Sequence, residues 1–201
     1  MIDLHLHFDG SLLPRTVLEL AQEQGILLPS LEPDELKLFL TAPADCGSLN
    51  EYLEKFDLPL QVLQTKEALR KAMYILVSSL KEQGMLYAEI RFAPQLHWKK
   101  GLTQEQVVKA ALTGMQEALA GSFFKCKLIL CCMRGADNRE ENLCTVRTAA
   151  AFLGRGVAAV DLAGAEALYP TTDFADIFRL ARELGKNTVV TVWLRLVHVR
   201  T

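Results

Sequence analysis

The amino-acid sequence predicts an α/β protein built on a parallel β-sheet of the (β/α)8 TIM-barrel type. Strand candidates begin near residues 127, 157 and 188, and a spacing of about 30 residues fits one strand plus its crossover helix. The run LILCC at residues 128–132 is apolar throughout, which is typical of parallel strands covered by helices. Because no glycine-rich phosphate loop follows the first strand, the pattern favours a barrel over an open dinucleotide-binding sheet.

The first third of the chain opens with a strand and a helix. Residues 2–8 form the strand candidate, and a helix is expected from about Pro14 to Gly25. Residues 26–64 are interrupted by prolines, and we expect a short amphipathic helix in SLNEYLEKF at residues 48–56. Thr65 is a suitable N-cap for a helix that ends at Gly84.

The remainder alternates strands and helices. Thr103 with Gln106, and Asn138 with Glu141, have capping-box spacing at the starts of two helices. The expected elements are a strand at 86–94, a helix at 103–120, a strand at 127–135, a helix from 138, a strand at 157–164 and a helix at 173–184.

Composition limits the classes of partner. The chain has 201 residues, half of them hydrophobic, and 22 basic against 24 acidic side chains give a net charge of -2. We therefore expect one domain that binds a small molecule and neither nucleic acid nor a membrane. The first residues lack the basic segment and apolar run of a secretory signal peptide. The five cysteines lack metal-site spacing. We therefore expect a cytoplasmic protein with reduced thiols.

Two histidines one residue apart mark the end of the first strand. In a strand, residues i and i+2 face the same way, so His5, His7 and Asp9 should share one face. In barrels the carboxyl ends of the strands hold the active site, and neutral imidazole is a good zinc ligand. The alternative is a pair of core histidines bonded to backbone or carboxylate groups.

Five segments together resemble the adenosine deaminase family, which are zinc-dependent barrel hydrolases. They are DLHLHFDGSLLPRTVLELA, SLNEYLEKFD, YAEIRFAP, LILCCMR and VDLAGAE, spread over about residues 2–186. The resemblance implies hydrolytic deamination of adenosine, 2′-deoxyadenosine or adenine by a zinc-activated water, with inosine and ammonia as the nucleoside products. It also implies that residues 1–186 are the amino-terminal part of the barrel.

The resemblance assigns roles to individual residues. His5 and His7 would bind one Zn²⁺, Asp9 would contact the ribose, and the Gly164 N–H would face the purine. The family's hydrophobic lid over the base corresponds to Leu49, Tyr52, Leu53 and Phe56. A helix that simply packs on the barrel has the same periodicity, so that interpretation of the lid segment stays open.

Other charged residues lie on the predicted strands. Glu89 and Arg91 alternate with apolar residues and should face the barrel interior, where we expect them to pair. Arg134 and Glu166 end strands at the predicted mouth. Glu166 either orients a ligand or merely begins a loop.

The sequence does not carry the whole family pattern. Where the family has a third zinc histidine and a proton-shuttling glutamate, alignment on ARELGK brings Thr191 and Leu194, and His198 lies about seven residues too far along. No catalytic residue is therefore identifiable, and we expect this chain to be inactive alone.

The last residues differ in character from the rest. Residues 187–199 carry strand-forming side chains without Gly or Pro, so we treat 187–201 as a divergent tail and expect a shortened or frame-shifted copy. A chain with about five of the eight strand–helix units of a barrel has open sheet edges, through which we expect self-association.

Two alternatives to a deaminase remain. One is a metal-dependent phosphoesterase barrel, and the other is a non-catalytic truncated barrel that self-associates.

Overall fold

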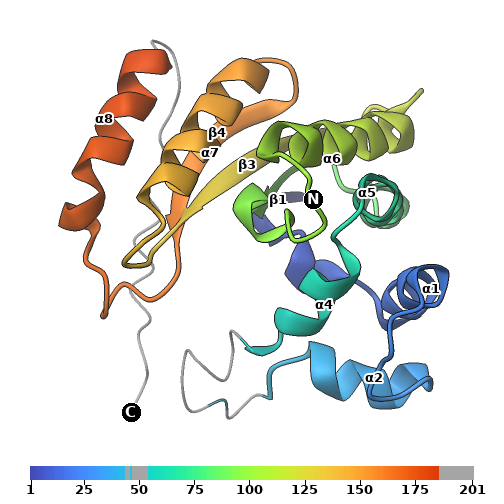
Figure 1. Cartoon of the computed structure of the whole chain (residues 1–201). Coiled ribbons are helices and arrows are strands. Elements are labelled where there is room, and N and C mark those ends of the chain that lie inside the picture. The colour runs from blue at the N-terminus through green and yellow to red at the C-terminus, as the bar shows by residue number, and fades with distance from the viewer. Residues whose placement is uncertain (44–45, 47–53, 186–201) are drawn as a thin grey trace.

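Four parallel strands form the centre of the computed structural model, which describes residues 1–43, 46 and 54–185 (Figure 1). They are β1 (Ile2–His7), β2 (Tyr87–Phe92), β3 (Lys125–Met133) and β4 (Val157–Ala163), in the spatial order β1-β2-β3-β4. All three pairings are parallel, so β1, β2 and β3 are each followed by a crossover that returns to the same end of the sheet. The predicted strand near residue 188 lies outside the described residues.

Helices connect the strands (Figure 1). The α-helices are α1 (Pro14–Gln24), α2 (Pro33–Leu40), α4 (Asp57–Val62), α5 (Lys66–Glu82), α6 (Gln104–Leu119), α7 (Arg139–Phe152) and α8 (Ala175–Leu184). Three short 3-10 turns are η1 (Asp9–Ser11), η2 (Pro94–Leu96) and η3 (Thr171–Phe174).

Most helix ends agree with the capping chemistry of the sequence. Gly25 closes α1 with φ 65°, the Thr65 side chain accepts from the Ala68 N–H, and Thr103 with Gln106 forms a complete capping box. The capping box expected at Asn138 is wrong, because its side chain makes no cap hydrogen bond. The Asn138 amide instead donates to the Met133 carbonyl at 2.8 Å, which ties the start of α7 to the end of β3.

The two faces of the sheet have different chemistry. Leu128, Leu130 and Cys132 of β3 belong to the hydrophobic core that the helices cover. The alternating residues Ile129 and Cys131 are also buried but lie outside that cluster. They share the opposite face with Arg91 and Asp161, so the polar face is the concave interior of a partial barrel.

Strand β1 is an edge of the sheet within the described part of the chain. Phe8, just after it, is fully buried and meets the Phe92 ring edge-on at a centroid distance of 5.5 Å. Leu6 is partly buried, whereas Leu4 is 43% exposed. Leu4 is therefore less well covered than Leu6 and Phe8 at this edge of the described sheet.

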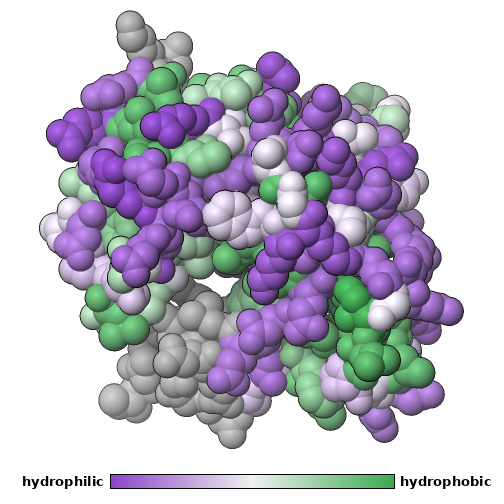
Figure 2. Space-filling model, viewed as in Figure 1, coloured by the Kyte–Doolittle hydropathy of each residue, from purple (hydrophilic) through white to green (hydrophobic). Residues whose placement is uncertain are grey.

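The surface viewed in Figure 2 is mostly hydrophilic, with an apolar patch where Figure 1 draws α1 and α2. Leu27, Leu31 and Leu38 in this region are 95%, 77% and 71% exposed. Among the described residues, no helix has the length and apolar composition needed to cross a membrane.

Candidate metal and nucleoside site

The side chains of His5 and His7 converge beside the carboxyl end of β1. Their Nε2 atoms lie 3.3 Å apart, and the ring centroids are 5.2 Å apart with planes inclined at 54°. His5 is exposed and His7 is half-buried, so the pair is open to solvent. The alternation of the strand places both rings on one face, as the sequence predicts.

The separation of the two Nε2 atoms fits a shared zinc ion. Two ligands at about 2.0–2.1 Å from a tetrahedral ion lie about 3.3–3.4 Å apart, which matches the observed 3.3 Å. No cluster of three or more His, Cys, Asp or Glu side chains suited to a metal occurs within the described residues. The two histidines therefore fit two corners of a tetrahedral site, and the described residues do not complete it.

Arg91 borders the histidine pair from β2. Its Nη1 lies 3.1 Å from Nδ1 and 3.2 Å from Nε2 of His5. His7 and Arg91 are paired in the parallel register of β1 and β2, which brings the guanidinium to the same end of the sheet. A fixed positive charge at this position opposes cation binding at His5 unless a nearby carboxylate balances it.

That carboxylate belongs to Asp161 of β4. Arg91 Nη2 forms an ion pair with Asp161 Oδ2, and the two side chains are only 5% and 1% exposed. The pair spans β3, because Arg91 is in register with Ile129 and Asp161 with Cys131. Asp161 was not singled out from the sequence, although an acidic residue within the apolar strand VAAVDLA is the signal that reveals it.

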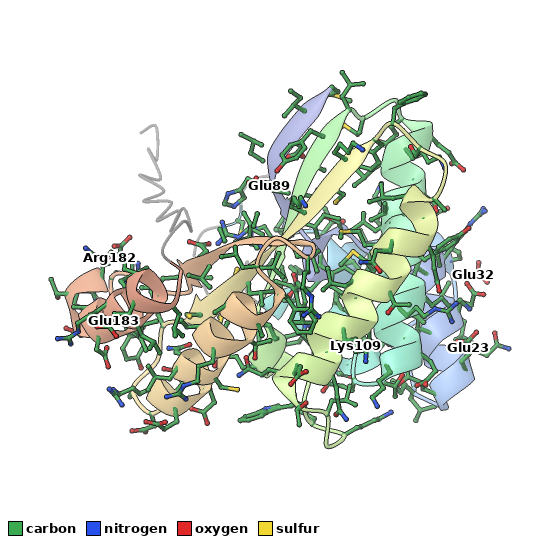
Figure 3. All side chains as sticks on the ribbon, turned by 90° about the horizontal axis from the view of Figure 1, so that it is seen from above. Glu23, Glu32, Glu89, Lys109, Arg182 and Glu183 are labelled. Carbon is green, nitrogen blue, oxygen red and sulfur yellow. The ribbon has the colours of Figure 1, made fainter. Side chains whose placement is uncertain are left out.

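The expected pairing of Glu89 with Arg91 is wrong. Glu89 Oε1 instead accepts a hydrogen bond of 2.8 Å from the Tyr87 hydroxyl on the same strand. Figure 3 shows Glu89 on the strands, well apart from Arg182 and Glu183 of α8. Arg91 lies two residues nearer than Glu89 to the carboxyl end of β2, and Arg91 forms its ion pair with Asp161 instead.

Asp9 lies in the η1 turn and not on the strand. Phe8 adopts αR dihedral angles (φ −63°, ψ −56°), which ends the alternation after His7. Asp9 is 6% exposed, and one of its carboxylate oxygens accepts from the Gly10 N–H at 3.1 Å. Burial raises the pKa of Asp9 to about 6, with backbone hydrogen bonds and the Arg91 charge acting in the opposite direction.

Phe56 approaches the histidines from the segment before α4. Its ring centroid lies 5.8 Å from that of His7. An added Cβ at Gly10 would be 3.0 Å from the Phe56 ring, so the ring covers the η1 turn closely. The other three predicted lid residues, Leu49, Tyr52 and Leu53, lie outside the described residues.

Gly164 follows β4 at the same end of the sheet. Its φ of 109° is a conformation that side-chain-bearing residues rarely adopt, and an added Cβ would lie 3.2 Å from the Arg134 Cβ. No acceptor within the described chain receives the Gly164 N–H. The sequence thus brings His5, His7, Asp9, Phe56 and Gly164 to one end of the sheet, on four separate segments.

Comparisons with known proteins identify a family. The family model described as adenosine deaminase matches residues 1–192. The adenosine deaminase of Haemophilus ducreyi is 51% identical over 189 residues, which are 92% of this chain and 55% of that protein. The adenosine deaminase of Clostridium botulinum is 40% identical over 189 residues, with 94% of this chain and 57% of that protein covered.

Solved structures have the same arrangement of strands and helices. An adenine deaminase from Arthrobacter aurescens matches with a TM-score of 0.73 at 25% identity, over 95% of this chain and 55% of that one. An amidohydrolase from Burkhoderia ambifaria, solved with bound Zn, matches with a TM-score of 0.78 at 21% identity, over 95% and 50%. These matches confirm the fold class predicted from the sequence, an incomplete barrel.

The chain spans about half the length of the curated relatives it matches. The match nevertheless extends over nearly all of this chain, from the histidine pair on β1 through Gly164 after β4. This protein is therefore a member of the adenosine deaminase family.

Proposed function

We propose that this chain forms the amino-terminal half of a zinc-dependent purine deaminase site. The observation that carries the proposal is the convergence of the His5 and His7 Nε2 atoms at 3.3 Å, at the carboxyl end of a parallel sheet, in a chain of this family. Bound zinc would supply the Lewis acidity that makes water a nucleophile near neutral pH. The reaction would be the hydrolytic deamination of adenosine, 2′-deoxyadenosine or adenine.

In this proposal, residues of the chain hold the substrate. Asp9 would accept a hydrogen bond from a ribose hydroxyl, because its carboxylate is fixed by the Gly10 N–H. Gly164 would donate its N–H to a purine nitrogen, because no acceptor in the described chain receives it. Phe56, with Leu49, Tyr52 and Leu53, would cover the base and exclude water.

The chain is proposed to bind but not to turn over its substrate alone. A general acid must protonate the ring while water attacks the adjacent carbon, and the sequence has Thr191 and Leu194 where the family has its third histidine and glutamate. The phosphoesterase alternative is not favoured, since both the family model and the curated relatives are adenosine deaminases.

Metal analysis of the purified chain tests the proposal. We expect about one equivalent of zinc after removal of free metal, and loss of that zinc in His5→Ala and His7→Ala. His198→Ala is the matched control and should keep its zinc. Zinc retained by both strand variants would contradict the proposed site, and turnover of adenosine by the 201-residue chain would contradict the proposed inactivity.

We also propose that the exposed edge of the sheet allows self-association. Met1, Ile2 and Leu86 at the amino end of β1 and β2 are 67%, 64% and 63% exposed. A groove of about 200 Å³ beside β1, lined by Leu6, Leu12 and Leu76 among others, adds apolar surface. Light scattering tests this proposal, and a monomer at all accessible concentrations would contradict it.

A cytoplasmic location is proposed from the cysteine chemistry. Cys126, Cys131 and Cys132 are buried thiols, and Cys144 is an exposed one. Free thiols are usual in reducing compartments. Fractionation of cells that express the chain would test the location, and recovery outside the cytoplasm would contradict it.

A further inference from the structure

Arg134 lies at the end of β3, directly beside Gly164. Its backbone N–H donates to the Ala163 carbonyl at 2.8 Å, which extends the pairing of β3 and β4 by one residue. The missing Cβ of Gly164 would meet both the Cβ and the backbone nitrogen of Arg134, at 3.2 and 3.3 Å. The two backbones are therefore in contact at the mouth of the partial barrel.

The Arg134 side chain turns toward the segment that follows Gly164. Nη1 donates to the Tyr169 carbonyl at 2.7 Å, and Nη2 donates to the Thr171 hydroxyl at 2.9 Å. Nη2 also lies 3.2 Å from Oε1 of Glu166. One guanidinium thus contacts three residues of the loop Gly164–Thr171, which runs from the end of β4 to the first residue of η3.

The loop has additional internal order at its centre. The Leu168 and Tyr169 N–H groups both donate to the Ala165 carbonyl, at 3.2 and 3.1 Å. The Thr171 hydroxyl lies 2.8 Å from the same Glu166 oxygen that Arg134 contacts. The guanidinium carbon is 6.0 Å from the Phe174 ring centroid, so the arginine lies against the η3 turn as well.

Burial makes this arginine different from a surface ion pair. The Arg134 side chain is 4% exposed, whereas Glu166 is 42% exposed. A buried guanidinium requires acceptors for its N–H groups, and the Tyr169 carbonyl and Thr171 hydroxyl are those acceptors. The partly exposed Glu166 carboxylate is screened by solvent and contributes less. Hence the planar two-sided donor geometry of arginine, more than its charge, ties β3 to the loop.

We infer that Arg134 is a positioning residue that holds the loop Gly164–Thr171 and thereby fixes the direction of the Gly164 N–H. The role in substrate binding rests on the proposed function, because it needs the Gly164 N–H to face a purine. The hold on the loop itself does not depend on that function. Glu166 accordingly begins an ordered loop and is oriented by Arg134 and Thr171.

Hydrogen exchange of the Leu168 and Tyr169 amides tests the hold on the loop. In Arg134→Lys one amine replaces two diverging donors, so we expect about tenfold faster exchange at these amides and unchanged exchange in β3 and α7. Arg139→Lys is the matched control, because Arg139 joins α7 to Asp176 on the surface with 61% exposure; exchange in the loop should not change. Unaltered loop exchange in Arg134→Lys would overturn the inference.

A second variant allows the same test if the first does not fold. If Arg134→Lys loses its helical circular dichroism, Thr171→Val removes one acceptor while leaving the arginine in place. It should accelerate exchange in the loop by a smaller factor than tenfold, about threefold. Exchange in Thr171→Val equal to that of the unmodified chain would overturn the inference.

Inosine binding by the zinc-loaded chain separates this inference from the proposed function. We expect Arg134→Lys to weaken inosine binding about tenfold while its zinc content stays the same, since His5 and His7 lie on a different strand. Faster loop exchange with unchanged inosine affinity would overturn the role in positioning Gly164. Absence of inosine binding by the unmodified chain would instead contradict the proposed function. Hydrogen exchange in the loop would still test whether Arg134 positions the loop Gly164–Thr171.

Discussion

Arg91 of β2 and Asp161 of β4 form a buried ion pair across β3. One guanidinium nitrogen pairs with the carboxylate, while another lies within hydrogen-bond distance of the His5 ring. The pair therefore joins three strands at the mouth of the partial barrel. Because both charges are almost entirely shielded from water, each depends on the other for its stability.

Removal of one member should destabilise the chain strongly. Arg91→Met leaves the Asp161 carboxylate buried without a cationic partner, and we expect a loss of about 3–5 kcal/mol in the free energy of unfolding. Arg70→Met is the matched control, since the Arg70–Glu117 pair is 57% and 39% exposed and should contribute less than about 1 kcal/mol. Urea denaturation measures both. The double variant Arg91→Met/Asp161→Leu should recover most of the loss. Equal losses of unfolding free energy in Arg91→Met and Arg70→Met would contradict this account.

His97 should make stability depend on pH. It is fully buried, its Nδ1–H donates to the Leu63 carbonyl at 3.0 Å, and burial lowers its pKa from 6.5 to about 4. The unfolded chain binds the proton more readily, so stability is full above pH 6.5 and falls as the pH decreases toward 4. The loss should approach about 3 kcal/mol at the acidic end.

The contribution of His97 is isolated by substitution. In His97→Gln the difference in unfolding free energy between neutral pH and about pH 4.5 should shrink by about 2 kcal/mol relative to the unmodified chain. Other groups, including Asp9, titrate in both proteins and cancel in the comparison. An identical pH dependence in the two proteins would show that His97 accepts its proton without penalty.

Gly114 is required by the packing of α6 on α5. A Cβ at this position would lie 2.1 Å from the Arg70 carbonyl oxygen, which the helix backbones cannot accommodate without separating. Gly114→Ala should therefore destabilise by about 2–3 kcal/mol, although alanine favours a helix by about 1 kcal/mol over glycine. Gln116→Ala, exposed on the same helix, is the control and should be neutral or slightly stabilising. A stabilised Gly114→Ala in thermal unfolding would contradict the observed helix contact.

Gly10 tests how firmly the Phe56 ring is held. A Cβ there would lie 3.0 Å from Cε1 of Phe56 and 3.4 Å from the His7 Cβ. Because the near atom is the edge of an aromatic ring, we expect Gly10→Ala to displace Phe56 at a cost below about 1.5 kcal/mol and to leave zinc content unchanged. A larger loss in urea denaturation would mean that the ring is immobile.

The regular elements follow from local chemistry and were therefore predictable. Alternation and apolar runs define the four described strands, and Thr65 and Thr103 define two helix starts. Helices α2 and α4 do not follow from the sequence pattern, because Pro33 and Pro59 indicate breaks in that segment. Pro33 occupies the first turn of α2, where a missing N–H has no intrahelical partner to lose.

The histidine pair was predictable and the ion pair beside it was not. His5 and His7 share one strand, so their common face follows from the period of two residues. The partner of Arg91 depends on the relative height of three strands, which no single segment encodes. The same limit applies to Arg134, whose acceptors lie 35 and 37 residues further along the chain.

The position of β1 at an edge of the described sheet has a consequence for assembly of the site. Whatever strand pairs with β1 in parallel will deliver the residues after its own carboxyl end next to His5 and His7. Missing coordination groups can therefore arrive laterally, by extension of the sheet, without any rearrangement of the four strands already in place. One strand added beside β1 would therefore extend the barrel and bring further ligands to the histidine pair at the same time.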